Sequence, residues 1–419
     1  MKDITGGVCA PKGFKAGGIW CGIKAGSKKR DLGLIYSEKI CTAAAMFTTN
    51  KVQAASVLVS REHLSNGKLH AIIANSGNAN ACTGEQGLAV ARRMAELAAD
   101  EFAIGVKEVA VASTGVIGVP LPIAAIENSI AALANSLRGD EAGHAAALEA
   151  IMTTDIRKKE AAIEIDIDGK DGAASAKVRI GAMTKGSGMI HPNMATMLCF
   201  ITTDAAISRE MLEISLQYAV RRSFNRLTVD GDTSTNDTVI IMANGEAGNP
   251  LISAADDNQK IFAEALTQVC IKLTKAMARD GEGASKLVTV TVNGASDEKT
   301  AEALAKSVAS SSLVKTACFG ADANWGRVLC ALGYAGVDFD PGKTQVRFKS
   351  RSGEIEVCRN GASVPFSEQD AKRILSEEEI EILADIGDGS GSGALTGSAT
   401  VWGCDLTYDY VKINGDYRS

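Results

Sequence analysis

The spacing of apolar and polar residues changes several times along this chain, which predicts a mixture of strands and helices. Short apolar, β-branched runs predict buried strands. These runs cover residues 55–59, 71–75, 109–112, 196–204, 238–242 and 287–292. Apolar and acidic residues alternate over residues 162–169, which predicts a half-exposed strand with residues 178–183 as its hairpin partner. Residues 406–413 alternate in the same way.

Apolar residues at helical spacing predict helices over residues 88–102, 210–224 and 259–278. Pro120 and Pro122 open a further predicted helix that continues to about Leu137. Because strands and helices are mixed, often with consecutive strands, we expect a layered α/β or α+β architecture. The glycine-rich residues 387–393 are the best candidate for a mobile surface loop.

The composition agrees with this picture and excludes several classes of protein. A chain of 419 residues suggests two or three domains, and its 46% hydrophobic and 22% charged residues are typical of a soluble globular protein. Aromatic residues make up 5%, so we expect a core of small aliphatic side chains. The net charge of −6 argues against nucleic-acid and anionic-membrane partners.

Several motifs are missing from the sequence, and their absence limits the compartment and the cofactors that we expect. Residues 1–9 have no apolar region of a signal peptide, and no apolar stretch reaches the length of a membrane span. Ten scattered cysteines without a C-x-x-C pair are typical of reduced thiols in a cytoplasmic protein. The four histidines form no metal-ligand pattern, and no glycine run has the lysine of a P-loop. We therefore expect neither a metal nor a nucleotide cofactor.

One segment carries the strongest chemical signal. A loop rich in Gly and Pro begins at Lys185 and leads, through Ala195, into the predicted strand that starts at Thr196. A chain that cuts itself between Ala195 and Thr196 would give Thr196 a free α-amine next to its own hydroxyl. Such an N-terminal threonine is a nucleophile with a built-in base. Taken alone, the segment favours the simpler interpretation, which is a loop followed by a core strand whose first residue is Thr.

Other candidate residues each have a structural alternative. Thr114 and Gly115 follow a predicted strand and offer a hydroxyl and an unhindered N–H for an oxyanion, or form an ordinary turn. Lys185 suits a substrate carboxylate, or is a solvated surface lysine. Glu282 stands between two glycines at a helix end, where it is either a ligand or part of a C-terminal turn.

Several long strings of residues, taken in their order along the chain, resemble the ornithine acetyltransferase family. The members of this family are the glutamate N-acetyltransferases of arginine biosynthesis. The resemblance extends over essentially the whole chain. The strings are residues 113–118, 152–155, 185–198, 224–237, 279–284, 319–327 and 409–414.

This resemblance implies an α/β sandwich similar in layout to N-terminal-nucleophile hydrolases, with its own connectivity. It implies cleavage between Ala195 and Thr196 into an α chain of 1–195 and a β chain of 196–419, assembled as α2β2. Thr196 is the implied nucleophile, and Thr114 and Gly115 form the implied oxyanion hole. The implied substrate contacts are Thr154, Lys185, Thr196, Glu282, Asn414 and Ser419. The choice of Thr154 over its neighbour Thr153 rests on the resemblance alone.

The implied reaction moves the acetyl group of N2-acetylornithine to glutamate through an acetyl ester of Thr196, without a cofactor. Members of the family differ in whether acetyl-CoA is also a donor. Two other classes stay open on the residues alone. One is an N-terminal-threonine amidohydrolase or aminopeptidase that passes the acyl group to water. The other is a non-catalytic amino-acid-binding protein in which Thr196 is only a strand residue.

Overall fold

The computed structural model describes residues 1–24, 26–169, 174–191, 197–387 and 397–415. The chain forms two compact units, which are described separately. Unit 1 contains Met1–Gly186, Asn193–Asn225 and Thr233–Leu273. Unit 2 contains Ser187–Pro192, Arg226–Asp232 and Thr274–Ser419.

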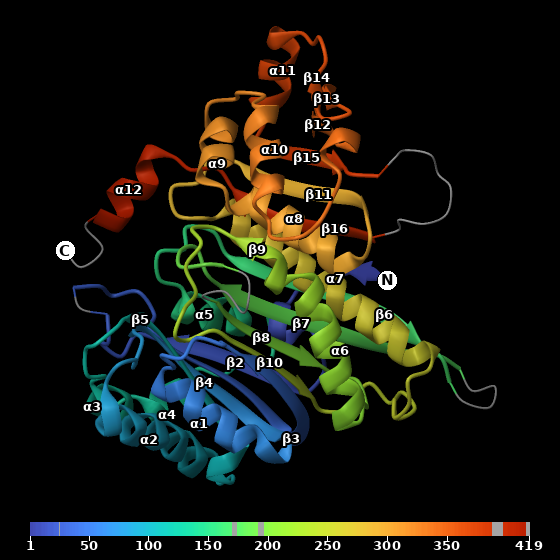
Figure 1. The fold of residues 1–419 in the computed structure, drawn as a ribbon. Coiled ribbons are helices and arrows are strands. Elements are labelled where there is room, and N and C mark those ends of the chain that lie inside the picture. Colours follow the sequence, from blue (N-terminus) through green and yellow to red (C-terminus); the bar gives the residue numbers. More distant parts are fainter. Residues whose placement is uncertain (25, 170–173, 192–196, 388–396, 416–419) are drawn as a thin grey trace. The chain divides into compact units, whose positions relative to one another are not determined.

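The described part of unit 1 is built on a nine-stranded sheet (Figure 1). Its order is β1-β6-β7-β8-β10-β3-β4-β5, and β2 also pairs with β3. The strands are β1 (Lys2–Asp3), β2 (Phe14–Ile19), β3 (Leu32–Phe47), β4 (Lys68–Asn78), β5 (Val109–Val116), β6 (Lys159–Ile167), β7 (Ala176–Lys185), β8 (Leu198–Thr203) and β10 (Thr238–Ala243).

Two pairs of strands in this sheet are parallel, namely β8 with β10 and β4 with β5, and the other pairs are antiparallel. Every residue of β8 and of β10 is buried. A strand covered on both faces has no solvent side, which explains why these two segments are continuously apolar rather than alternating.

Helices cover both faces of the unit 1 sheet. They are α1 (Ala55–His63), α2 (Gly84–Phe102), α3 (Ile123–Glu127), α4 (Ile130–Asn135), α5 (Glu141–Ile151) and α6 (Arg209–Arg222). Successive residues of β4 enter different apolar clusters: Ile73 packs in the cluster with Met94 of α2, and Ile72 in the cluster with Leu148 of α5. Since successive side chains of a strand point to opposite faces, this division places helices on both sides of the sheet. The layered α/β expectation is confirmed.

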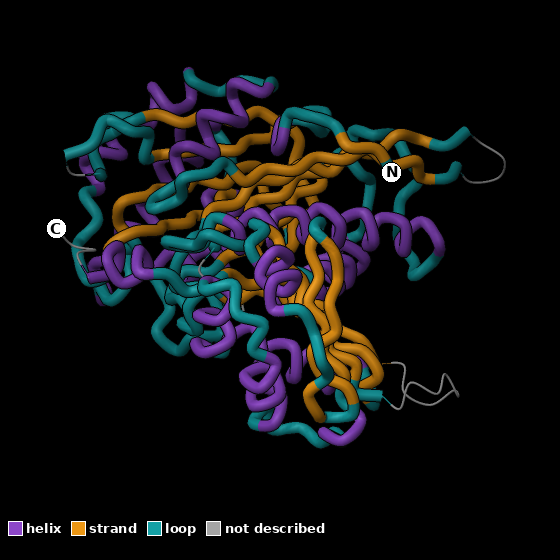
Figure 2. The backbone as a smooth tube through the Cα atoms, turned by 90° about the horizontal axis from the view of Figure 1, so that it is seen from above, coloured by secondary structure: helices purple, strands orange, loops and turns teal. Residues whose placement is uncertain are grey.

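Unit 2 has a sheet of its own, with seven strands among the described residues in the order β14-β13-β12-β15-β11-β16-β9. These are β9 (Leu227–Thr228), β11 (Leu287–Ala295), β12 (Gln345–Ser350), β13 (Gly353–Arg359), β14 (Ala362–Ser363), β15 (Glu379–Asp385) and β16 (Gly397–Cys404). Its helices are α8 (Glu298–Ser310), α9 (Ser312–Phe319), α10 (Trp325–Gly333), α11 (Glu368–Leu375) and α12 (Tyr408–Gly415). Helix α7 (Asp257–Arg279) contains the boundary between the units. Figure 2 shows strands gathered into sheets and flanked by helices.

The predicted strands at residues 71–75, 109–112, 162–169, 178–183, 238–242 and 287–292 are confirmed. Within the predicted strand 196–204, the structure describes residues 197–204, and β8 begins at Leu198. The three longer predicted helices correspond to α2, α6 and α7. The single helix expected up to Leu137 is divided into α3 and α4, because Asn128 and Ser129 end the first and begin the second.

Two element predictions are wrong. Residues 55–59 form the start of helix α1, not a strand. A short apolar run does not by itself distinguish a buried strand from the buried side of a helix, and α1 continues into the exposed Arg61 and Glu62. Residues 406–413 lie mainly in helix α12, where Tyr408 and Val411 are exposed. Their alternation therefore belongs to a surface helix.

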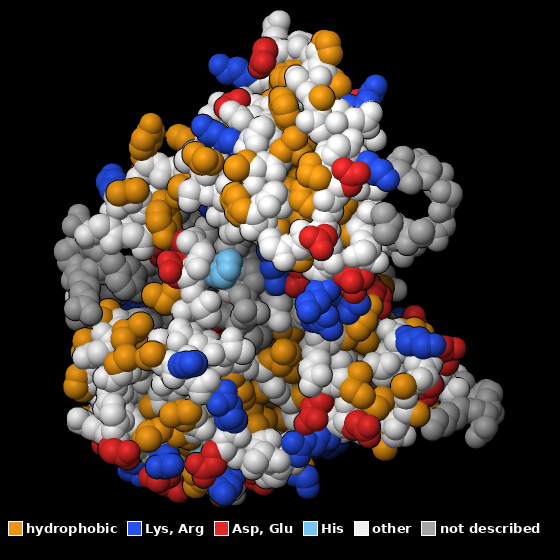
Figure 3. All heavy atoms as spheres, viewed as in Figure 1, with side chains coloured by type: hydrophobic (Ala, Val, Ile, Leu, Met, Phe, Trp, Pro, Cys, Tyr) orange, Lys and Arg blue, Asp and Glu red, His pale blue; other side chains and the backbone are white. Residues whose placement is uncertain are grey.

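The glycine-rich loop predicted at 387–393 lies outside the described residues except for Gly387. The two compact units also differ from the predicted chains 1–195 and 196–419, because each unit contains residues of both. Compactness does not test cleavage, which stays a prediction. In the described ranges, no helix is long and apolar enough to cross a membrane. Figure 3 shows acidic and basic side chains scattered over the face that it draws.

Candidate active site

Thr114 and Lys185, which are distant in the sequence, meet in unit 1. Thr114 lies near the carboxyl end of β5, and Lys185 is the last residue of β7. Both residues are buried, and Lys185 Nζ donates a hydrogen bond of 3.3 Å to Thr114 Oγ1. An ammonium group only donates, so the hydroxyl must accept this bond. The hydroxyl hydrogen of Thr114 is then available for a second acceptor, such as an oxyanion.

Gly115 occupies a position that only glycine fits. Its φ of 135° lies in the region that other residues avoid. A Cβ at this position would lie 2.3 Å from the carbonyl carbon of Gly77 and 2.5 Å from the backbone nitrogen of Asn78, where β4 and β5 run side by side. The sequence therefore requires glycine here for both conformation and close backbone approach.

Asp155 holds the backbone at Gly186, the residue that follows β7. Its Oδ1 accepts hydrogen bonds from Gly186 N at 2.8 Å and from Lys159 Nζ at 2.6 Å, and both side chains of this ion pair are buried. Burial alone would raise the pKa of Asp155, but the positive charges of Lys185 and Lys159 outweigh it and hold the pKa below its usual range. Asp155 is therefore ionised and partly balances the charge of Lys185.

A second buried carboxyl group, that of Asp237 directly before β10, contacts the backbone just before β8. The backbone N–H of Met197, one residue before β8, donates to Asp237 Oδ1 at 2.9 Å. Asp237 is fully buried, and its Oδ2 has no hydrogen-bond partner among the described residues. Burial raises the pKa of Asp237 well above its usual value, against the lowering effects of the Met197 N–H and the charge of Lys185.

Asn236 connects this carboxyl group to the oxyanion candidates. Its side-chain amide donates to the carbonyl of Ser113 at 2.8 Å and to that of Ala79 at 2.7 Å. Ser113 directly precedes Thr114. The consecutive residues Asn236 and Asp237 therefore hold the neighbours of Thr114 and Thr196, respectively.

In unit 2, the structure brings Glu282 and Asn414 together. Asn414 Nδ2 of α12 donates to Glu282 Oε2 at 2.9 Å. The backbone N–H of Glu282 donates to the Ser187 carbonyl at 2.9 Å, and Gly188 lies directly against the carboxylate. A Cβ on Gly188 would stand 2.3 Å from Glu282 Oε2. Glycine is thus required at position 188 for the Glu282 carboxylate to keep its position.

Asp230, also in unit 2, fixes the segment that precedes the predicted cleavage point. Its carboxylate accepts the backbone N–H groups of Met189, at 2.5 Å, and Ile190, at 2.8 Å. Burial raises the pKa of Asp230. Burial also raises the pKa of Tyr410 on α12, and the nearby charges of Asp230, Asp232 and Glu282 raise it further. Asp230, Asp232 and Glu282 therefore all lie near the same tyrosine.

The structure shows less about the remaining residues that the sequence predicted for the site. Thr154 is half-buried and precedes Asp155 in the connection between α5 and β6. Ala195, Thr196 and Ser419 lie outside the described residues. The sequence interpretation gave no role to Asp155, Asn236 or Asp237, although their strings contributed to the resemblance. The polar run 234–237 directly before a buried strand was the signal that could have identified Asp237.

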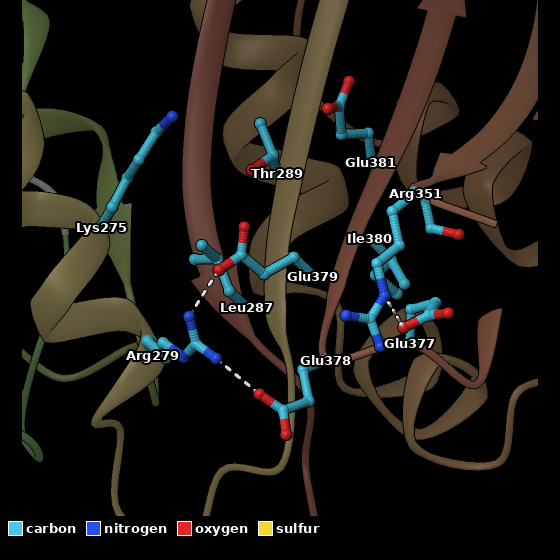
Figure 4. Close-up of a pocket in the computed structure, with 11 residues that line it drawn as sticks. Lys275, Arg279, Leu287, Thr289, Arg351, Glu377, Glu378, Glu379, Ile380 and Glu381 are labelled. Carbon is cyan, nitrogen blue, oxygen red and sulfur yellow. Dashed lines mark hydrogen bonds and ion pairs between the residues drawn. The ribbon is translucent and has the colours of Figure 1, made fainter. Parts of the chain in front are cut away.

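The pocket drawn in Figure 4 contains none of these residues. It has a volume of about 490 Å³ and lies in unit 2, beside β11 and β15. Arg279 points toward Glu378 and Glu379, and Arg351 toward Glu377 (Figure 4), so the arginines are already engaged in ion pairs. Within the described ranges, no group of three His, Cys, Asp or Glu side chains could hold a metal.

A buried hydroxyl with its hydrogen available, next to a backbone N–H at a glycine-restricted position, offers the kind of donors that an oxyanion requires. Comparison with known proteins identifies the family. The ArgJ family matches residues 15–419, so this chain belongs to the ArgJ family.

Two relatives match over all or nearly all of the chain. The arginine biosynthesis bifunctional protein ArgJ of Symbiobacterium thermophilum is 51% identical, with all of both chains covered. ArgJ 1 of Clostridium acetobutylicum is 49% identical over 97% of this chain and 96% of its own. A crystal structure of the Bacillus halodurans argJ protein is 40% identical, with a TM-score of 0.47, and covers 51% of this chain and 96% of its own.

The family expected from the sequence is confirmed. With it, the expectation of an acetyltransferase of arginine biosynthesis is confirmed. Family membership favours this function over the two alternatives, the amidohydrolase and the non-catalytic binding protein. The roles of individual residues stay predictions.

Proposed function

We propose that this protein cleaves itself between Ala195 and Thr196 and then transfers acetyl from N2-acetylornithine to glutamate through an acetyl ester of Thr196. The observation that carries the proposal is the hydrogen bond from Lys185 to the buried hydroxyl of Thr114, next to the position that only Gly115 fits. An acyl carrier on the enzyme removes the need for a cofactor.

The steps follow from the chemistry of the groups. The α-amine of Thr196, with an ordinary pKa of about 7.7–8.0, takes the hydroxyl proton near neutral pH. Oγ attacks the acetyl carbonyl, and the oxyanion accepts hydrogen bonds from the Thr114 hydroxyl and the Gly115 N–H. Collapse of the tetrahedral intermediate expels ornithine, whose leaving nitrogen takes up the proton from the α-ammonium. The α-amine of glutamate then attacks the ester carbonyl, and the bond between the acetyl carbon and Thr196 Oγ breaks. The glutamate nitrogen loses a proton to the α-amine of Thr196, which returns it to Oγ and restores the free hydroxyl.

Substrate recognition is divided by charge in this proposal. Lys185 binds the α-carboxylate that donor and acceptor share, as a compact cation. Glu282 and Asn414 bind the remaining polar groups, with Thr154 and the C-terminal Ser419 as further contacts. Glu282 lies near the same tyrosine as Asp230 and Asp232, and this group of carboxyl side chains suits the ammonium group of the ornithine side chain. The two fragments remain associated as an α2β2 assembly, and the protein acts in the cytoplasm.

Two measurements test the proposal together. A denaturing gel with N-terminal sequencing should show two fragments, the second beginning at Thr196, and Thr196→Ala should give one uncut, inactive chain. Mass spectrometry of the β chain after incubation with acetylornithine alone should show one acetyl group on the Thr196 hydroxyl. An active alanine variant, or a new terminus elsewhere, contradicts the proposal.

Kinetics distinguish the covalent route from direct transfer. With an acetyl-enzyme, the first product leaves before glutamate reacts, so double-reciprocal plots against acetylornithine at several glutamate concentrations are parallel. Direct transfer between two bound amino acids gives intersecting lines and an unmodified β chain. Acetate release without glutamate would instead identify an amidohydrolase. The word "bifunctional" in the relatives' names motivates the same assay with acetyl-CoA as donor.

A further inference from the structure

Lys24, in unit 1, is a lysine that the proposed mechanism does not use. Its side chain is half-buried, and Nζ donates hydrogen bonds to the carbonyl of Arg30 at 2.9 Å and to that of Met152 at 2.8 Å. An ammonium group has three N–H donors. Among the residues that the structure describes, Lys24 Nζ has no third hydrogen-bond partner and no carboxylate bonded to it. One N–H is therefore available to a ligand.

The stem of Lys24 lies beside the proposed oxyanion hole. A Cβ added at Gly77 would stand 2.8 Å from Lys24 Cγ. Gly77 of β4 is paired with Gly115 of β5, and a Cβ added at Gly115 would stand 2.3 Å from the Gly77 carbonyl carbon. Lys24 and Gly115 therefore both lie against the backbone of Gly77.

The ammonium end of Lys24 reaches the segment that follows α5. Met152, whose carbonyl accepts from Nζ, directly follows this helix and precedes Thr154, a predicted substrate contact, by two residues. Next along the chain is Asp155, whose carboxylate holds the residue after Lys185. Both ends of the Lys24 side chain are thus connected to groups of the candidate active site.

Asp31 fixes the backbone that carries Lys24. Asp31 is fully buried, and its carboxylate accepts the N–H groups of Cys21 at 2.6 Å, Gly22 at 3.2 Å and Lys24 at 3.0 Å. The carbonyl of Asp31 accepts from the N–H of Ser76 in β4. The turn is therefore anchored to the sheet, and a cation that is held in place loses less entropy when a ligand binds.

Two neighbouring cations suit the acceptor better than the donor. Burial lowers the pKa of Lys24, and the charge of Lys185 lowers it further. Like charges disfavour each other, and a bound anion relieves this. N2-acetylornithine brings one carboxylate and a side-chain ammonium, whereas glutamate brings two carboxylates. Because Lys185 is proposed for the carboxylate that both share, the side-chain carboxylate of glutamate remains for Lys24.

We propose that Lys24 selects glutamate as the acetyl acceptor by donating a hydrogen bond from Nζ to the side-chain carboxylate of glutamate. This inference rests on the proposed function, because it assigns a contact of the acceptor in that reaction. The ammonium keeps its proton throughout, and no bond forms or breaks at Lys24. The same charge repels the side-chain ammonium of ornithine, so the two substrates use different groups for their side chains.

A structural role for Lys24 makes a different prediction. A lysine that binds the last carbonyls of a helix stabilises the helix end, and Met152 is the C-terminal cap of α5. Loss of such a cap would impair all substrates alike, whereas acceptor selection concerns glutamate alone. Labelled ornithine is the matched acceptor, because its exchange with acetylornithine uses the same acetyl-enzyme but an acceptor with a side-chain ammonium.

The test compares Lys24→Met with Lys24→Arg and Lys29→Met in the full-length protein. We expect Lys24→Met to lower kcat/KM for glutamate about 10- to 100-fold, the usual effect of losing a hydrogen bond to a charged group. Its kcat/KM for the exchange of labelled ornithine should change little. Lys24→Arg keeps the charge and should recover most of the activity with glutamate. Lys29 is exposed in the same loop, so Lys29→Met should behave as the wild type.

Equal losses with glutamate and ornithine in Lys24→Met, or no loss with either, overturn the proposal. If Lys24→Met does not fold, the wild type decides with glutamine, which has the shape of glutamate but a neutral side chain. Glutamate should then react at least about tenfold faster than glutamine, and equal rates overturn the proposal. A wild type that exchanges no labelled ornithine overturns the proposed function itself, so the two failures are distinguishable.

Discussion

Lys185 Nζ donates a hydrogen bond of 3.3 Å to Thr114 Oγ1, although the two residues are 71 positions apart in the sequence. Both are buried, at the end of β7 and near the end of β5. The bond uses an acceptor site of the hydroxyl and leaves its hydrogen for another acceptor. The Thr114 side chain is thus held by Lys185 and is still able to donate.

Thr114→Val should lower kcat for acetyl transfer by a factor of about 10²–10³, the typical cost of losing one oxyanion donor. KM should change little, because the hydroxyl is proposed to act on charge that develops only in the transition state. Thr114→Ser, which keeps the hydroxyl, should retain most of the activity. An unchanged kcat with a raised KM in Thr114→Val would make Thr114 a substrate-binding residue instead.

Gly115→Ala should destabilise the fold by roughly 2–6 kcal/mol, because strain at the positive φ and overpacking each cost about 1–3 kcal/mol. The control is Gly118→Ala, which has a φ of 79° but no atom within 4 Å of the added Cβ. It should therefore cost only the strain. Urea unfolding of both variants measures the difference, and equal destabilisation would rule out the contact with Gly77.

Gly188→Ala should raise KM roughly tenfold or more with the fold intact, because the new Cβ displaces the Glu282 carboxylate. The magnitude follows from the loss of a hydrogen bond between this carboxylate and substrate, since a hydrogen bond to a charged group contributes about 1.5–3 kcal/mol. Gly333→Ala, also in unit 2, places its Cβ where no atom lies within 4 Å and should behave as the wild type. Steady-state kinetics with both substrates check this. A wild-type KM in Gly188→Ala would remove Glu282 from substrate binding.

Asp155→Asn should destabilise the protein at pH 7 by about 3–5 kcal/mol, the usual cost of removing one partner of a buried ion pair. The folded-state pKa of Asp155 is lowered, so its ionised form stabilises the fold above the unfolded-state pKa of about 3.9. This stabilisation is lost as the pH falls toward the folded-state pKa. Urea unfolding at pH values from 7 to 3 should show wild type and variant converging on the acid side.

The exposed Asp257, whose pKa is lowered by Lys260 on the surface, is the control for this experiment. Asp257→Asn should not change the unfolding midpoint measurably at any pH, because solvent screens the pair. A pH-independent difference between Asp155→Asn and the wild type would show that Asp155 acts through its shape rather than its charge.

The sequence predicted much of the fold because many elements carry their own signal. β8 and β10 are continuously apolar since both faces are covered, and β6 and β7 are recognisable as a hairpin. The prediction failed where the local pattern was ambiguous. Residues 55–59 became helix α1, whose Ser60 hydroxyl bonds the carbonyl of Val111 in β5, a contact outside any local window.

By itself, the sequence determined the family, the acetyltransferase function and the identity of residues such as Thr114, Lys185 and Glu282 as candidates. Only the tertiary structure decided that Lys185 donates to Thr114, that Asp155 balances its charge, and that Asp237 holds the residue after Thr196. The physical reason is that burial changes the energy of a charge according to its neighbours in space. Those neighbours come from β5, β7 and the segment before β10, which folding brings together.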